Sequence, residues 1–223
     1  MGEIVTNLET DRESLTVVAS VACARHAAAV RVQNRDQIDN VLLLAVLAAG
    51  AKYNIGTQSD EWYRTFDDTI QTGAEWAVEA GVWKRVTRST DTFDLAEILP
   101  AGTAAAENAL LAVRAEHYPL RGALRFGAIA GKEAAVLCAV SDLTARPGTL
   151  SVVLGAVAFV FKSDLPVDDP LATRPWVEVA DAFLRVSKYS IDTTEPGYDT
   201  IQERIKKALG DRVKKYLYRT PIE

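Results

Sequence analysis

The chain has 223 residues, 48% hydrophobic and 25% charged, a mixture typical of a globular protein with a sizeable apolar core. A net charge of −5 and a pI near 5.2 argue against a nucleic-acid-binding protein, which usually presents a basic face. Two cysteines are too few for a disulfide scaffold, and the two histidines, His26 and His117, lie far apart. We therefore expect no metal and no bound cofactor, in a reduced, cytoplasmic environment.

The first apolar stretch, SLTVVASVACARHAAAV, predicts an Ala-rich helix over residues 11–32 that is buried around most of its circumference. Acidic residues precede it, whereas a secretory signal begins with basic ones. Arg25 and His26 interrupt it before it reaches the roughly 20 residues that span a bilayer. We therefore expect neither a signal peptide nor a transmembrane helix.

Helical spacing of apolar residues predicts two further helices, over about 36–52 and 60–81. Residues 82–93 change to a two-residue period, which indicates a strand. Pro100 is well placed to open a fourth helix over about 101–116. The first half of the chain is therefore predicted to be rich in helix.

After Pro119 the pattern indicates strands. Two apolar runs flank Gly131-Lys132 and predict a hairpin, and TLSVVLGAVAFVFKS predicts a long strand. WVEVADAFLRVSKYSI predicts another strand, with a helix as the alternative, and an amphipathic helix follows over about 198–217. Helices followed by consecutive strands predict one α+β domain over 1–223, with a helical part over about 11–116 and a sheet over about 120–190. We expect the N-terminal helices to pack on a largely antiparallel or mixed sheet.

The sequence contains no glycine-rich phosphate loop, no GxSxG and no HExxH. Glu75 and Glu79 lie four residues apart on the third predicted helix, a spacing that usually marks a solvated face rather than a pair of catalytic acids. The two cysteines remain. Cys23 lies among alanines and is interpreted as a small buried apolar residue.

Cys138, in GKEAAVLCAVSD, lies on a predicted strand that is apolar on both faces. A thiol in such a place is either an inert core residue or the group around which a site is built. Valine or alanine would fill the same space, which favours a function for the sulfur.

The order of elements, helices first and then hairpins, resembles the Erwinia virulence factor family. So does the single cysteine on an apolar strand, AAVLCAVSD, about 85 residues before the end. The resemblance covers roughly residues 100–200. It implies an α/β fold with a palmitoyl group in thioester linkage to Cys138. Helices that wrap long strands also resemble the Cyt family of cytolytic toxins, which needs no cysteine.

A thioester at Cys138 has two interpretations. It is either a permanent lipid or a catalytic intermediate that accepts an acyl chain and passes it on. The intermediate would take the chain from acyl-CoA or acyl carrier protein and hold it in an apolar tunnel. His117 is the candidate base, and its alternative role is a helix cap or surface residue.

A permanent lipid needs a second membrane signal. The C-terminal helix offers a local charge of +5, with candidate contacts to an anionic membrane from Lys206, Lys207, Arg212, Lys214 and Lys215. The alternative is an ordinary solvated helix face.

Three hypotheses follow from the sequence. The leading one is a fatty-acyl-binding protein or acyltransferase that works through Cys138. The second is a membrane-interacting virulence factor or cytolysin-like protein, with peripheral membrane association. The third is a non-catalytic interaction protein.

Overall fold

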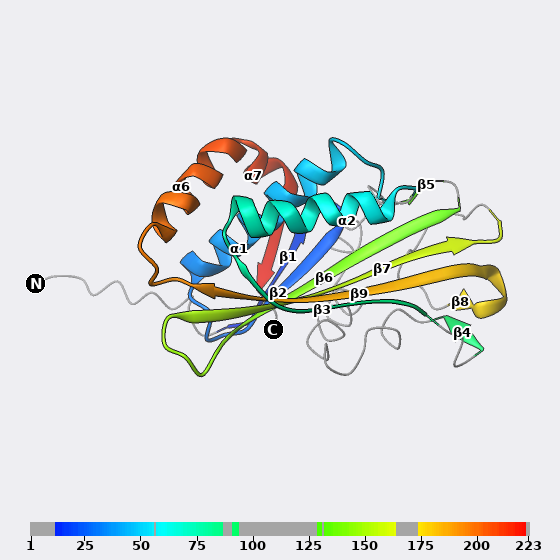
Figure 1. Ribbon diagram of the computed structural model, residues 1–223, viewed down its shortest axis with the longest axis horizontal. Coiled ribbons are helices and arrows are strands. Elements are labelled where there is room, and N and C mark those ends of the chain that lie inside the picture. The colour runs from blue at the N-terminus through cyan, green and yellow to red at the C-terminus, as the bar shows by residue number, and fades with distance from the viewer. Residues whose placement is uncertain are drawn as a thin grey trace, which may run out of the picture.

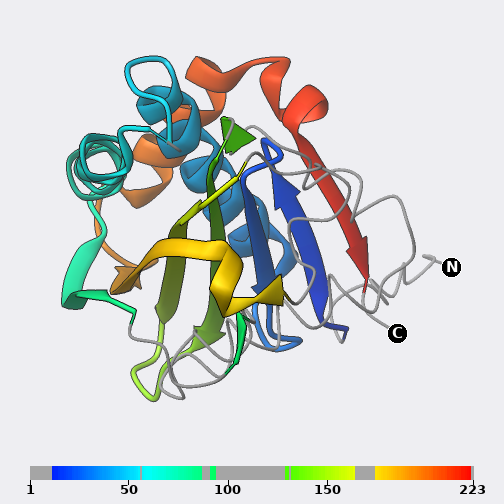
Figure 2. The same ribbon diagram turned by 90° about the vertical axis from the view of Figure 1, so that its right-hand side faces the viewer.

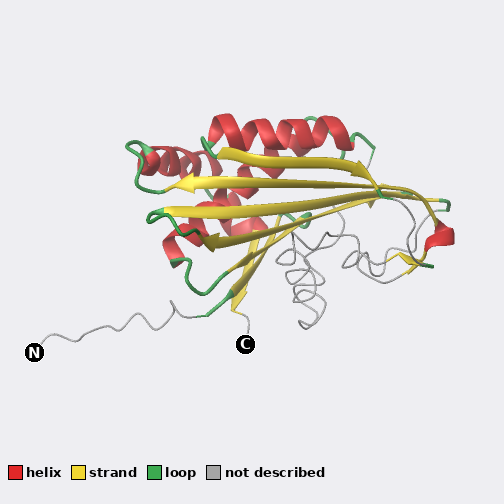
Figure 3. Ribbon diagram, turned by 60° about the horizontal axis from the view of Figure 1, so that its bottom comes forward, coloured by secondary structure: helices red, strands yellow, loops and turns green. Residues whose placement is uncertain are grey.

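The computed structural model describes residues 12–55, 57–86, 91–93, 129–130, 132–163 and 174–221. In these residues an open, mixed sheet carries helices on one face, which is the α+β architecture that the sequence predicts (Figures 1 and 3). The elements are β1 (Ser14–Val18), β2 (Ala22–His26), α1 (Val32–Gly50), α2 (Ser59–Asp68), the π-helical turn η1 (Thr69–Gly73), β3 (Ala77–Arg85), β4 (Thr92–Phe93), β5 (Ile129–Ala130), β6 (Glu133–Leu143), β7 (Thr149–Phe161), β8 (Arg174–Pro175), the 3-10 turn η3 (Trp176–Glu178), β9 (Val179–Asp192), α6 (Tyr198–Leu209), α7 (Arg212–Tyr216) and β10 (Leu217–Pro221).

The main sheet has the strand order β10-β1-β2-β6-β7-β9-β3, with β5 paired to β6. Every described pair in it is antiparallel except β2–β6, which is parallel. The N-terminal strand β1 and the C-terminal strand β10 therefore lie side by side at one edge (Figure 2). The β2–β6 pair joins this N- and C-terminal part of the sheet to the long central strands.

Residues 14–26 form a hairpin, so the predicted helix over 11–32 is wrong. β1 and β2 pair with Val18 opposite Ala22. The turn holds Ala19 at a φ of 48° and Ser20 at a φ of 60°, in the left-handed region that glycine or asparagine normally occupies. Neither residue type marks the turn here. Almost every side chain of both strands is buried, so the run also lacks the alternation of a half-exposed strand.

The helix predicted over 36–52 is confirmed as α1, but the one predicted over 60–81 is too long. It ends in η1, and Glu75, at a φ of 58°, turns the chain into β3. Glu75 and Glu79 therefore do not share a helix face. The strand predicted over 82–93 begins earlier, at Ala77, and ends at Arg85. The helix predicted over 101–116 lies outside the described residues.

The second half follows the prediction more closely. β7 and β9 are the two long strands, and β5 pairs with β6 across Gly131-Lys132. The sheet is wider than the predicted range of about 120–190, because β1, β2, β3 and β10 join it. The helix predicted over 198–217 is divided at Gly210 into α6 and α7, and the chain then enters β10.

The apolar core lies between the sheet and the helices. Leu42 of α1, Phe66 of α2 and Ile205 of α6 pack there against side chains such as Leu137 of β6 and Leu154 of β7. Alternate residues of the same strands point to the opposite face of the sheet, and many of these are buried as well. They include Leu15, Val17, Cys23, Cys138, Val157 and Leu184. The expectation that the strand of Cys138 is buried on both faces is confirmed.

Candidate functional site

A buried polar network lies between α1 and the N-terminal strands. Asp39 of α1 is fully buried, and its Oδ1 lies 2.8 Å from Nε2 of His26 on β2. The hydroxyl of Thr16 on β1 donates to Oδ2 of Asp39 at 2.9 Å. Arg219 of β10 donates to the same carboxylate and also pairs with the exposed Asp36. The network therefore ties three strands, β1, β2 and β10, to one carboxylate of α1.

His26 joins the network to the centre of the sheet, because its Nδ1 lies 2.7 Å from the hydroxyl of Ser141 on β6. Ser141, His26 and Asp39 have the composition of a catalytic triad. The ring is turned, however, so that Nε2 faces the carboxylate and Nδ1 faces the hydroxyl. All three side chains are buried, with exposed fractions of 1% or less, so the hydroxyl is shielded from solvent. The hydrogen bonds hold β2, β6 and α1 together.

No sequence motif marks this network. His26 interrupts an apolar run, and Asp39 lies in the polar stretch QNRDQIDN at the start of α1. The histidine is the available signal, since a buried polar group needs a partner. The sequence does not show which partners it finds, because His26 and Ser141 lie 115 positions apart.

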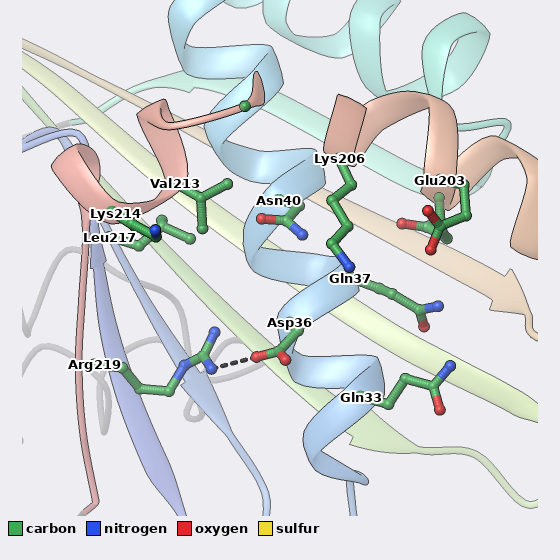
Figure 4. Close-up of a pocket in the computed structure, with 12 residues that line it drawn as sticks. Gln33, Asp36, Gln37, Asn40, Glu203, Lys206, Val213, Lys214, Leu217 and Arg219 are labelled. Atoms are coloured by element: carbon green, nitrogen blue, oxygen red, sulfur yellow. Dashed lines mark hydrogen bonds and ion pairs between the residues drawn. The ribbon is translucent and has the colours of Figure 1, made fainter. Parts of the chain in front are cut away.

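A crevice of about 560 Å³ opens beside the network, between α1 and the segment α6–α7–β10 (Figure 4). Most of the residues that line it are polar, and they are mixed in charge. The polar residues are four carboxamides, two carboxylates and three cations: Gln33, Gln37, Asn40, Gln202, Asp36, Glu203, Lys206, Lys214 and Arg219. In the close-up, Lys206 reaches from α6 toward α1, and Arg219 is bonded to Asp36 on the opposite wall.

Two residues connect this crevice to the interior. Arg219 lines it while holding the buried Asp39, so a group bound in the crevice would contact a member of the network. Gln202 of α6 is 6% exposed, and its Nε2 donor has no hydrogen-bond partner among the described residues. A buried donor without a partner costs about 1–3 kcal/mol, which favours a site that takes up an acceptor. The crevice therefore combines cationic side chains with a hydrogen-bond donor, Nε2 of Gln202, that has no partner among the described residues.

The basic segment, which we define as Arg204–Lys215, presents six cations on the surface of α6 and α7. It carries six basic residues and one acidic residue, a charge of +5 in a chain of −5. All six are exposed, and none forms an ion pair with an acidic side chain in the part of the chain that the structure describes: Arg204, Lys206, Lys207, Arg212, Lys214 and Lys215. The opposite side of α6 is packed in the core through Ile205 and Leu209, so the helix is amphipathic as predicted.

Of the predicted catalytic pair, the structure describes only Cys138, because His117 lies outside the described residues. Cys138 is 2% exposed, on the face of the sheet opposite α1 and α2. Its neighbour in register on β2 is Cys23, with the two Sγ atoms 3.2 Å apart. Nothing in the sequence indicates this contact, because 115 positions separate the two cysteines. The apolar tunnel expected beside Cys138 stays a prediction.

Among the described residues, no set of three or more His, Cys, Asp or Glu side chains is arranged to hold a metal ion. The same part of the chain has no helix with both the length and the apolar character needed to cross a membrane.

No protein-family model matches the sequence, and no curated protein matches it either. Two solved structures are weak neighbours of the fold. One is a delta-endotoxin, at 8% identity and a TM-score of 0.40, with 77% of this chain and 82% of the other covered. The other is the Evf virulence factor, at 10% identity and a TM-score of 0.35, with 90% and 84% covered.

Proposed function

We propose that this protein binds anionic membrane surfaces through the basic segment. The observation that carries the proposal is the group of six exposed cations that have no acidic partner among the described residues. Each lysine or arginine near an anionic bilayer contributes about 1 kcal/mol of attraction. Six of them therefore supply enough energy for peripheral binding without an inserted helix.

The geometry of α6 sets the mode of binding. Ile205 and Leu209 are each 2% exposed and pack against the core, so α6 cannot turn its apolar side toward lipid without unfolding the layer beneath it. Binding is therefore electrostatic, and it weakens as salt screens the charges. Tyr218, half exposed at the start of β10, adds an amphipathic ring next to the basic segment.

The test is co-sedimentation of the full chain with vesicles of phosphatidylcholine, with and without phosphatidylglycerol. We expect binding only to the mixed vesicles, with an affinity that falls steeply between low and physiological salt. Neutralising Lys207 and Lys215 to Gln removes two contacts and should weaken binding about 30-fold, the equivalent of 2 kcal/mol.

The matched control replaces Lys84 and Lys162 by Gln, since these exposed lysines lie outside the basic segment. It changes the net charge equally and should leave vesicle binding nearly unchanged. Equal loss in both double variants, or binding that is insensitive to salt, contradicts the proposal.

An acyl thioester at Cys138 is the second candidate function. The supporting observation is the position of Cys138 in an apolar layer, among side chains such as Val136 and Val157, where a fatty chain would be shielded from water. Intact mass spectrometry of protein purified from cells tests it. An acyl increment that hydroxylamine releases, and that Cys138→Ser abolishes while Cys23→Ser does not, is the expected result. An unmodified mass in both the wild-type protein and the Cys23→Ser variant contradicts it.

A further inference from the structure

The two cysteines of this chain meet, although they lie 115 positions apart in the sequence. Cys23 on β2 and Cys138 on β6 are direct partners in the ladder, and their Sγ atoms are 3.2 Å apart. Both thiols are buried, so each is shielded from solvent and lies against the other.

The two cysteines lie close enough for a disulfide. Adjacent strands lie about 4.7–4.9 Å apart, within the range of Cα separations that a disulfide bridges. The sulfurs lie 3.2 Å apart and have to approach to the bonded distance of about 2.05 Å.

We propose that Cys23 and Cys138 form a reversible disulfide, and that this bond is a redox modification of the protein. Hydrogen peroxide is the oxidant, because it is small and uncharged enough to reach thiols that are 0% and 2% exposed. One thiol is oxidised to a sulfenic acid with release of water. The second thiol then attacks that sulfur, and the S–S bond forms with release of another water. Two thiols and one peroxide thus give one disulfide and two waters.

The location gives the bond a structural effect. β2–β6 is the parallel pair that joins the N- and C-terminal strands to the central sheet. A disulfide there closes a loop of more than one hundred residues, and a loop of this size strongly restricts the unfolded chain. Oxidation therefore crosslinks β2 to β6. It also consumes the Cys138 thiol to which an acyl group would be attached.

The experiment treats the reduced full-length protein with hydrogen peroxide, removes the peroxide, unfolds the chain and adds N-ethylmaleimide. The untreated protein should take up two labels, one for each cysteine. The treated protein should take up none, and its intact mass should fall by two hydrogen atoms until dithiothreitol restores it. The melting temperature of the oxidised form should be higher by about 5–10 °C.

Cys23→Ser and Cys138→Ser are the controls, and each leaves one sulfur without its partner. Neither should lose two hydrogens, and neither should show a melting temperature that rises on oxidation. The proposal is overturned if both thiols of the treated wild-type protein still take up label, if they gain oxygen without crosslinking, or if the only disulfide formed joins two chains. The wild-type result decides the matter even if a variant fails to fold.

Discussion

Two buried carboxylates under the helices show how partners decide the charge state of an acidic residue. Burial alone would raise the pKa of Asp39, but His26 and Arg219 outweigh it and hold that pKa below its usual value. Burial raises the pKa of Asp67, and the hydrogen bond from Tyr189 and the nearby Arg185 do not offset it. The difference lies in the partners, since Asp39 is bonded to both His26 and Arg219 whereas Asp67 is bonded to Arg185 and a tyrosine hydroxyl.

Replacing Asp39 by Asn should destabilise the protein by about 3 kcal/mol, because it removes the negative charge that Arg219 faces and puts an NH2 donor in place of one of the two acceptor oxygens. Urea unfolding at neutral pH measures the change. Asp36→Asn is the matched control, since Asp36 pairs with the same arginine on the surface. It should cost less than about 1 kcal/mol. Equal effects would show that the buried carboxylate has no special role.

The lowered pKa of Asp39 also predicts acid sensitivity. A carboxyl group whose pKa is lower in the folded state stabilises the protein above its unfolded pKa, near 3.8 for aspartate, and this contribution is lost as pH falls through the folded value. The stability difference between the wild type and Asp39→Asn should therefore shrink as pH falls below about 4. Urea unfolding at a series of pH values tests this. A difference that instead grows as pH falls would show that the direction of the shift is wrong.

At the scale of elements, Gly210 decides how the C-terminal segment is built. Its φ of 53° and ψ of −131° interrupt the helical path, so the predicted single helix becomes α6 and α7 and the chain can turn into β10. A Cβ at this position would meet no atom within 4 Å. Glycine is therefore required at position 210 by the backbone conformation and not by a lack of space for a side chain.

Gly210→Ala should consequently destabilise the protein by about 2 kcal/mol, as expected for a non-glycine residue forced into this region. Gly50→Ala provides the comparison, because Gly50 ends α1 in a right-handed conformation and its Cβ would make an ordinary contact with Trp62 at 3.9 Å. Alanine should be neutral or mildly stabilising there. Thermal unfolding of the two variants measures the contrast, and a harmless Gly210→Ala would refute the backbone argument.

At the scale of the whole molecule, the two ends of the chain complete one side of the sheet. β10 covers the edge of β1 and carries Arg219 to Asp39. Without β10, β1 would be an uncovered edge of buried apolar residues, and such edges promote aggregation.

A chain that ends at Tyr216 should therefore melt at a lower temperature than the full chain and aggregate on heating. Arg219→Gln separates the two causes, since it removes the ion pair but keeps the strand. We expect this variant to lose stability without increased light scattering. A truncated chain that is no more prone to aggregate than Arg219→Gln would show that the edge needs no cover.

Part of this organisation could be predicted from the sequence, because it depends on local patterns. The period of apolar residues predicts α1, β7 and β9, and the class α+β follows from their order. The same patterns misassign residues 14–26, where Ala19 and Ser20 adopt a turn that neither residue type signals. Boundaries such as Gly210 were missed because glycine is compatible with several backbone paths.

The candidate site divides in the same way. The charge of the basic segment and the apolar setting of Cys138 are properties of neighbouring residues, so they can be predicted from the sequence. The contact between Cys23 and Cys138 and the network of His26, Asp39 and Ser141 join distant residues, so they are visible only in the folded chain. Both depend on the parallel pairing of β2 with β6, a register set by the packing of both faces of the sheet across more than one hundred intervening positions.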